Sequence, residues 1–164
     1  LDGGMGQMLR GLGNGQFIPL SPLESGIIVT GQGAAVSVVD FNSDLAPDLA
    51  MTVNDEPMRS WVNKCKTTRV RLAIRLKGGV GNRAAIGGRV VARTRSGVVQ
   101  AMEVRAGSGY LSQSTTNLFL ASDPADPVES VSITWPDGFR QQRAVQSDED
   151  RVVVIQQSHG TNRQ

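Results

Sequence analysis

The sequence predicts an all-β protein built from short strands and glycine-rich turns. Apolar and charged residues alternate along residues 68–76, which places Val70 and Leu72 on one face and Arg69 and Arg71 on the other. This period of two is typical of a half-buried strand with one solvated face. The chain has 19 Gly and 7 Pro against 4 Phe, 2 Trp and 1 Tyr, a composition that favours many tight turns. No segment has a helical period of useful length.

Further strands are predicted in the second half of the chain, and turn residues separate them. Residues 130–135 alternate in the same way, and Pro136-Asp137-Gly138 then provides a turn. Ser96-Gly97 is a second predicted turn. The strands expected around these turns are 89–95, 98–105, 130–135, 139–145 and 151–156.

The composition changes near residues 63–67, and we place a domain boundary at 63–66. The residues before it are glycine-rich and mildly acidic, whereas those after it form long strands with many arginines. The expected units are residues 1–63, residues 67–157 and a flexible tail, 158–164. The chain begins at Leu1 with neither an initiator methionine nor a signal-peptide pattern, so we expect it to be part of a longer protein.

Composition and the rare residue types argue against several functional classes. No stretch approaches the roughly 20 consecutive apolar residues of a membrane helix, so no membrane span is expected. A net charge of only +2 lacks the one-sided charge typical of a nucleic-acid binder. Cys65 is the only cysteine, and His159, the only histidine, lies in the polar tail. Neither a histidine-based triad nor a zinc site is therefore expected.

One loop has the residue spacing of a calcium site. Asp40, Asn42, Asp44 and Asp48 occupy loop positions 1, 3, 5 and 9 between two apolar strands. Ca²⁺ prefers six to eight oxygen ligands, and the carbonyl of Ala46 could supply another. The alternative is a polar turn that needs no metal. Position 6, which is usually glycine in such loops, is Leu45 here.

Residues 34–63 resemble one blade of an FG-GAP/VCBS-type β-propeller. They contain this loop, the apolar strand after it, Asn54-Asp55 and a closing Asn63, and residues 11–17 resemble the glycine-turn-Phe element of a preceding repeat. The resemblance implies calcium as a cofactor and the rest of the propeller as a partner in the full-length protein. A lone blade has open edges and an uncovered face, so residues 1–62 are expected to be incomplete or to pack on the second domain.

The second half of the chain is similar to the ASPIC/UnbV domain. The stretches that carry the similarity are 81–90 (Gly-Asn-Arg-Ala-Ala-Ile-Gly-Gly-Arg-Val), 103–114 (with Gly-Ser-Gly-Tyr-Leu-Ser-Gln-Ser) and 131–138 (ending in Trp-Pro-Asp-Gly). The family often has Gly-Leu-Gly after the Leu-x-Phe strand, whereas this chain has Ala121-Ser122. Together the resemblances imply the cartilage acidic protein-like arrangement: partial propeller blades followed by an antiparallel β-sandwich or barrel-like domain.

The family-like segments contain a candidate ligand pocket. Its residues, which suit a sugar or an acidic ligand, are Asn82, Arg83, Arg105, Ser108, Tyr110 and Gln113. The alternative is that the glycines serve bulges and close packing, while Asn82 and Arg83 tie a loop to the sheet. Residues 78–81 are glycine-rich, but neither the Lys-Ser/Thr pair nor the helix of a phosphate loop follows them.

The resemblance favours a non-enzymatic, secreted, extracellular or periplasmic binding or adhesion module, with a protein or carbohydrate partner at the cell exterior. The main alternative is a glycan-acting hydrolase, or a carbohydrate-binding accessory domain of an exported enzyme. A hydrolase needs paired carboxylates, whereas Asp123, Asp126 and Glu129 fall in solvated turns. Nucleic-acid binding is not expected, because aromatic residues for base stacking do not accompany the arginines.

Overall fold

The computed structural model describes residues 6–64, 66–145 and 151–158, and within them the protein is all-β, as predicted. Cys65 and His159 lie outside the described residues. The elements of the first part are β1 (Met8–Gly11), β2 (Phe17–Leu20), α1 (Pro22–Ser25), β3 (Gly33–Val39), β4 (Asp48–Val53) and β5 (Glu56–Trp61). The second part contains β6 (Val70–Lys77), β7 (Arg89–Thr94), β8 (Val99–Glu103), β9 (Leu118–Ser122), β10 (Val128–Thr134), β11 (Arg140–Ala144) and β12 (Arg151–Gln156).

The single turn α1 is an element that the sequence analysis did not predict. Ser21 Oγ caps it by accepting a hydrogen bond from Glu24 N, and the Glu24 carboxylate accepts one from Ser21 N. The turn ends at Gly26, which has a φ of 68°. No helix in the described part of the chain has the length and the apolar character that crossing a membrane requires.

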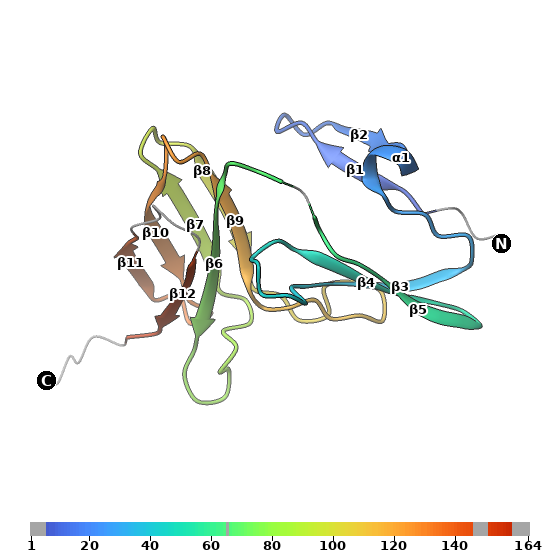
Figure 1. Cartoon of the computed structure of the whole chain (residues 1–164). Helices are drawn as coiled ribbons and strands as arrows, with labels where there is room; N and C mark the ends of the chain where they lie inside the picture. Colours follow the sequence, from blue (N-terminus) through green and yellow to red (C-terminus); the bar gives the residue numbers. More distant parts are fainter. Residues whose placement is uncertain (1–5, 65, 146–150, 159–164) are drawn as a thin grey trace, which may run out of the picture.

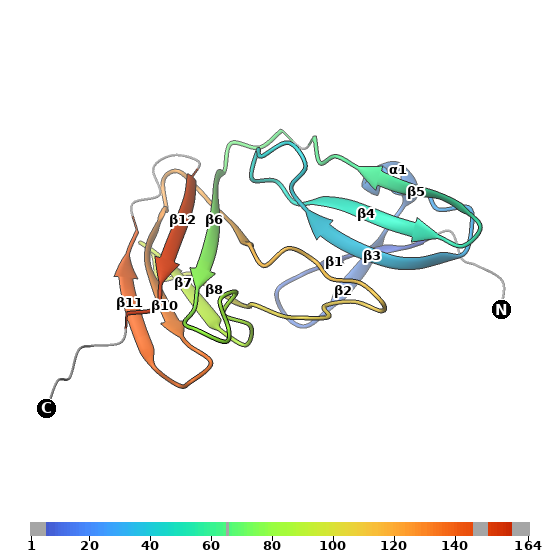
Figure 2. The ribbon, with the colours of Figure 1, turned by 90° about the horizontal axis from the view of Figure 1, so that it is seen from below.

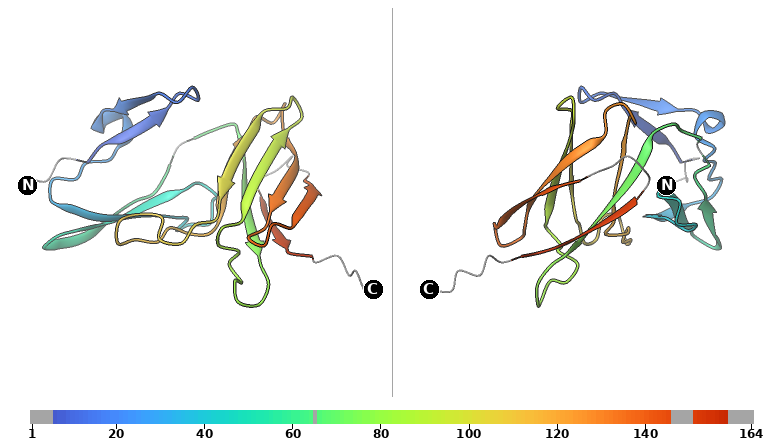
Figure 3. Two further views of the ribbon diagram at one scale, coloured as in Figure 1. Left: turned by 180° about the vertical axis from the view of Figure 1, so that it is seen from behind. Right: turned by 60° about the vertical axis from the view of Figure 1, so that its left-hand side comes forward.

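The second part of the chain is a two-layer sandwich. One sheet has the strand order β12-β6-β9 and the other β11-β10-β7-β8, and the two layers face each other in Figure 3. The predicted hairpins β7–β8 and β10–β11 are both antiparallel. The expected antiparallel sandwich is confirmed with one exception, since β12 runs parallel to β6. β12 follows a strand of the opposite sheet, so no tight turn forces it to run antiparallel to its neighbour.

Alternating apolar residues of both sheets fill the space between them. Leu72, Ile74 and Leu76 of β6 meet Val131 and Ile133 of β10 in one buried cluster. Trp135, which directly follows β10, belongs to the same cluster. Its side chain is 1% exposed and its indole N–H donates to Gln141 Oε1 at 3.0 Å. The largest buried side chain of the domain is therefore also hydrogen-bonded.

The second face of β6 is not fully solvated, contrary to the sequence-based expectation. Ala73 is completely buried and the side chain of Arg71 is only 19% exposed, whereas Arg75 is exposed. The reason is tertiary: the turn after β3 reaches the sandwich at this point, where Arg71 donates a hydrogen bond to Asp44. Strand alternation alone cannot distinguish a solvated face from one that another part of the chain covers.

The first part of the chain forms a three-stranded antiparallel sheet, β3-β4-β5, and a separate hairpin, β1–β2 (Figures 1 and 2). Few of its apolar residues are buried: within residues 6–64 they are Val29, Ala46 and Val53. Its exposed large apolar residues are Met8, Leu9, Leu12, Phe17, Leu23, Ile28, Val36, Phe41, Met58 and Val62. Most of the large apolar side chains of the first part of the chain therefore remain exposed.

Candidate functional site

The loop between β3 and β4 is held by its own carboxylates. Asp40 accepts hydrogen bonds from the main-chain N–H groups of Asp44 (3.2 Å) and Leu45 (3.0 Å). Asp48, whose side chain is almost fully buried, accepts from Phe41 N (2.8 Å) and Asn63 N (2.7 Å). Asp48 therefore ties the loop to the chain that follows β5. The side chain of Asn63 adds a second tie, because its Nδ2 donates to Pro47 O at 3.3 Å.

Leu45 occupies the loop position where glycine was expected, and its backbone adopts the glycine-like conformation nonetheless. Its φ is 62°, in the left-handed region, and Ser43 has a φ of 60°. The sharp turn is therefore made without glycine. The hydrogen bonds that surround these two residues supply the constraint that holds them there.

Asp44 is the point where the loop meets the sandwich domain. Its carboxylate accepts from Ala46 N at 2.8 Å and from Asn42 Nδ2 at 3.1 Å, and Arg71 lies 3.8 Å from Oδ2. The main-chain hydrogen bond from Ala46, followed by the contacts with Asn42 and Arg71, lowers the pKa of Asp44 below its ordinary value. The carboxylate is thus stabilised in its charged form.

The oxygen atoms of this loop suit a hard cation in type. Asp40, Asn42, Asp44, Asp48 and the carbonyl of Ala46 would be the residues that hold calcium, and the ion would supply positive charge that stiffens the loop. In the described ranges, no group of three or more His, Cys, Asp and Glu side chains is arranged to hold a metal ion. The carboxylate oxygens of Asp40 and Asp48 instead receive N–H donors, and a guanidinium provides a local positive charge.

A second loop, residues 105–117, connects β8 to β9 and crosses to the first part of the chain. Gln113 shapes it: Oε1 accepts from Gly107 N, and Nε2 donates to Arg105 O at 3.0 Å and to Ser114 O at 2.6 Å. Ser108 Oγ accepts from Ser114 N at 3.0 Å. These bonds fix the family-like Gly-Ser-Gly-Tyr-Leu-Ser-Gln-Ser segment as a compact loop.

This loop docks along the outer edge of β3. Ser112 Oγ donates to Val36 O at 2.6 Å, Ser114 Oγ accepts from Val38 N at 3.0 Å, and Thr115 N donates to Val38 O at 2.9 Å. The loop runs beside β3 in Figure 2. It therefore satisfies main-chain groups that an edge strand would otherwise present to solvent. We call the contact between residues 112–115 and β3 the interdomain clamp.

The predicted ligand-pocket residues lie in two different loops. Asn82 ties its own loop together through hydrogen bonds with Ile86 N and O, both 2.9 Å. Arg105 contacts Glu103 at 3.4 Å, and Tyr110 is 78% exposed near the clamp. Of the six predicted residues, only Asn82 and Arg83 line the two hollows at the ends of β6 and β12. The structure therefore does not bring the six together around either hollow.

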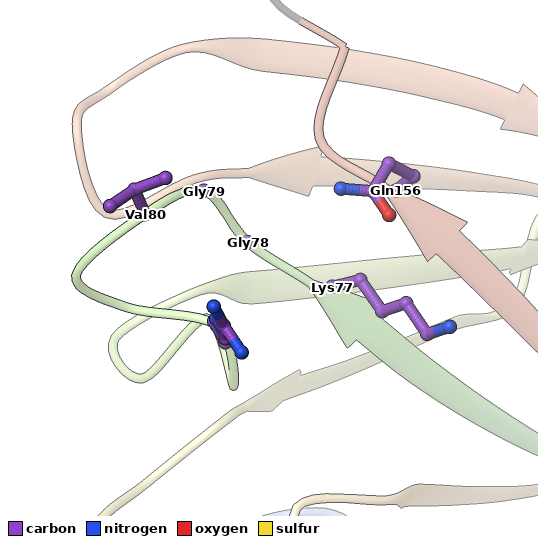
Figure 4. Close-up of a pocket in the computed structure, with 6 residues that line it drawn as sticks. Lys77, Gly78, Gly79, Val80 and Gln156 are labelled. Carbon is purple, nitrogen blue, oxygen red and sulfur yellow. The ribbon is translucent and has the colours of Figure 1, made fainter.

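The sandwich has a groove where β6 and β12 end side by side. The larger hollow, about 490 Å³, is lined by Lys77, Gly78, Gly79, Val80, Arg83 and Gln156. In Figure 4, Lys77 and Gln156 lie at the ends of adjacent strands and the glycine loop continues from Lys77. A smaller hollow of about 250 Å³ shares residues 78–80 and adds Pro136, Asp137 and Gln157. Sequence analysis found the glycines here but missed Lys77 and Gln156.

Two acidic residues of the second domain, Asp126 in a turn and Glu129 on β10, act as internal acceptors. Asp126 accepts from Ser96 Oγ at 2.6 Å, Ser96 N at 2.7 Å and Thr94 Oγ1 at 2.8 Å. The hydrogen bonds from Ser96 are the main reason that the pKa of Asp126 lies below its ordinary value. Glu129 pairs with Arg95 at 2.8 Å. The hydrogen bonds of Asp126 thus join the turn between β7 and β8 to the segment that precedes β10.

A comparison with curated proteins found no match. A comparison with protein families found one match: the family model described as ASPIC and UnbV matches residues 78–162. The matched region includes the loop 78–88, the clamp and β7 to β12. It spans slightly more than half of the chain, and the chain therefore belongs to the ASPIC and UnbV family.

Proposed function

We propose that this protein is a non-enzymatic binding or adhesion module that works outside the cell or in the periplasm. In this proposal the first part of the chain is a blade of the FG-GAP/VCBS propeller type, as in cartilage acidic protein-like proteins. The rest of that propeller covers its exposed apolar residues in the full-length protein. The ligand is a protein or a carbohydrate at the cell exterior.

The observation that carries the proposal is the interdomain clamp. The most distinctive family segment uses Ser112, Ser114 and Thr115 to bind the edge of β3. Its polar groups therefore join two parts of the protein, and the segment has a structural role. A rigid junction of this kind suits a module that presents surfaces to a partner.

Three of the described carboxylates lack the property that the acid of a glycan-acting hydrolase requires. A glycan-acting hydrolase needs one carboxylic acid whose pKa is raised, so that it stays protonated near neutral pH. The carboxylates of Glu24, Asp44 and Asp126 have lowered pKa values, in each case with a hydrogen bond from a neighbouring residue as the first cause. The alternative is a hydrolase or a carbohydrate-binding accessory domain of an exported enzyme. Cleavage of the polysaccharide by the protein would distinguish a hydrolase from the proposed binding module.

Polysaccharides incubated with the protein provide the test. We expect the protein to be retained on a polysaccharide or on cell-surface material. We expect no release of reducing ends from the polysaccharide. Release in proportion to protein concentration, lost in a heat-denatured control, would contradict the non-enzymatic proposal and favour the hydrolase.

Calcium is a further part of the proposal, and thermal unfolding tests it. Excess Ca²⁺ is expected to raise Tm relative to chelator, because an ion that binds only the folded state stabilises it. Asp44→Asn should abolish that rise, whereas Asp55→Asn, in the exposed turn after β4, should retain it. Identical Tm values with calcium and chelator would mean that Arg71 and the N–H donors hold the loop without a metal.

A further inference from the structure

We propose that the groove at the ends of β6 and β12 binds the carboxylate or sulfate groups of an acidic polysaccharide. The proposal rests on the binding function above and names a site and a ligand class for it. We call this site the Lys77–Arg83 groove. It consists of the residues that line the larger hollow: Lys77, Gly78, Gly79, Val80, Arg83 and Gln156.

The groove holds two positive charges that the protein does not neutralise. Lys77 and Arg83 are both exposed, and neither side chain has an ion pair or a hydrogen bond within residues 6–64, 66–145 and 151–158. By contrast, the guanidinium groups of Arg59, Arg71, Arg95 and Arg105 each contact a carboxylate. Adjacent cations without counter-charges attract an anion. Acidic side chains are absent from the lining of the larger hollow.

Among the residues that line the two hollows, the acidic one is Asp137, and it accepts hydrogen bonds from the protein itself. Asp137 lines the smaller hollow, where it accepts from Gln157 Nε2 at 2.8 Å and from Phe139 N at 3.0 Å. Asp137 keeps its negative charge, but it lines only the smaller hollow. The charged side chains that line the larger hollow are those of Lys77 and Arg83.

The glycine loop is preformed and leaves main-chain donors for a ligand. Gly78 N donates to Arg83 O at 3.0 Å, and Asn82 braces the loop through Ile86. A Cβ on Gly78 would overlap Asn82 O, so this close approach requires glycine. The N–H groups of Gly79 and Val80 have no acceptor among the described residues. Free N–H groups beside two cations are a suitable arrangement for an oxyanion.

The lining favours a polysaccharide over a nucleic acid. Neither hollow is lined by an aromatic residue, so no ring is present on which bases could stack. Gln156 and Gln157 instead offer amide groups, which can donate to and accept from sugar hydroxyls. The guanidinium of Arg83 matches the planar geometry of a carboxylate.

Affinity for defined polymers tests the inference. The probes are polygalacturonate for carboxylates, dextran sulfate for sulfates and unmodified dextran as the neutral control. We expect the chain to bind one or both charged polymers at low ionic strength and not dextran. The double variant Lys77→Gln/Arg83→Gln should bind about tenfold more weakly, since each exposed ion contact contributes a few-fold.

A matched variant separates the groove from overall charge. Arg93→Gln/Arg143→Gln removes the same charge from exposed positions on β7 and β11 that do not line the groove, and its affinity should stay within about twofold of wild type. Gly79→Asp adds a carboxylate where the structure has room, because the nearest atom to a Cβ there is 3.9 Å away. It should abolish binding while Tm is retained.

The possible outcomes are distinct. If the two double variants lose affinity equally, or if Lys77→Gln/Arg83→Gln keeps the wild-type affinity, the groove is not the binding site. The proposed binding function would not be affected by either result. Tighter binding of poly(dT) with the same dependence on Lys77 and Arg83 would overturn the polysaccharide assignment. Release of reducing ends would contradict the non-enzymatic function instead.

Discussion

The guanidinium of Arg71 donates a hydrogen bond to the main-chain oxygen of Asp44 at 3.0 Å, across the boundary between the two parts of the chain. Its nitrogen is also 3.8 Å from the Asp44 carboxylate. Arg71 lies on β6 of the sandwich, and Asp44 lies in the turn between β3 and β4. Together with the clamp on β3, this contact attaches the first part of the chain at a second point.

Replacement of Arg71 by leucine should lower stability more than the same change at Arg69. Arg71→Leu removes a charged hydrogen bond to a main-chain carbonyl, and we expect a loss of about 1–2 kcal/mol in the free energy of unfolding. Arg69 is exposed just before β6, so Arg69→Leu is the control. Urea denaturation measures both, and equal midpoints would show that the contact does not contribute.

Asp48 should be the most sensitive acidic residue of the loop. Asp48→Ala leaves the N–H groups of Phe41 and Asn63 without their acceptor inside a buried site, at a cost of about 2–4 kcal/mol. Asp48→Asn keeps one acceptor oxygen and should lose less. Chemical denaturation of both variants provides the measurement. If Asp48→Ala lowers the free energy of unfolding no more than Asp55→Asn does, Asp48 is not the acceptor that holds the loop.

Asp126 should make stability depend on pH in the acidic range. Its pKa is lowered in the folded state, chiefly by Ser96, so its contribution is complete above the unfolded pKa of about 3.9 and is lost as pH falls through the lower folded value. Urea midpoints of wild type should therefore fall between neutral pH and about pH 2 more steeply than those of Asp126→Asn. Parallel curves for wild type and Asp126→Asn would refute the prediction.

The clamp should open when Gly109 gains a side chain. A Cβ at this position would overlap Ser112 Oγ and press on Val36 O, so Gly109→Ala displaces the docked loop. Hydrogen exchange should then accelerate at the amide of Val38, which donates to Ser114 Oγ, with little change in the core strands β6 and β10. Tyr110→Ala removes an exposed side chain beside Gly109 and serves as the control. Unchanged exchange at Val38 would mean that the loop does not hold β3.

Local pattern was enough to predict much of the sandwich. Alternation along 130–135 and the turn at 136–138 predicted the hairpin β10–β11, and the family-like stretches predicted membership of the ASPIC and UnbV family. These features depend on residues close in sequence, whose side-chain period and turn chemistry are encoded directly. Ser21 and Glu24 also encode the cap of α1, although the turn is too short to produce a helical period.

Contacts between distant segments were decided only by the tertiary structure. The sequence by itself determined an all-β chain with hairpins, an Asp-rich loop and a family-specific segment. It did not determine that β12 pairs in parallel with β6, that Arg71 faces Asp44, or that Ser112 and Ser114 bind β3. Alternation shows that Arg71 lies opposite the core, but burial of that face depends on which segment packs over it. The physical reason is that such contacts arise from docking of one folded unit on another, and local periodicity does not record that docking.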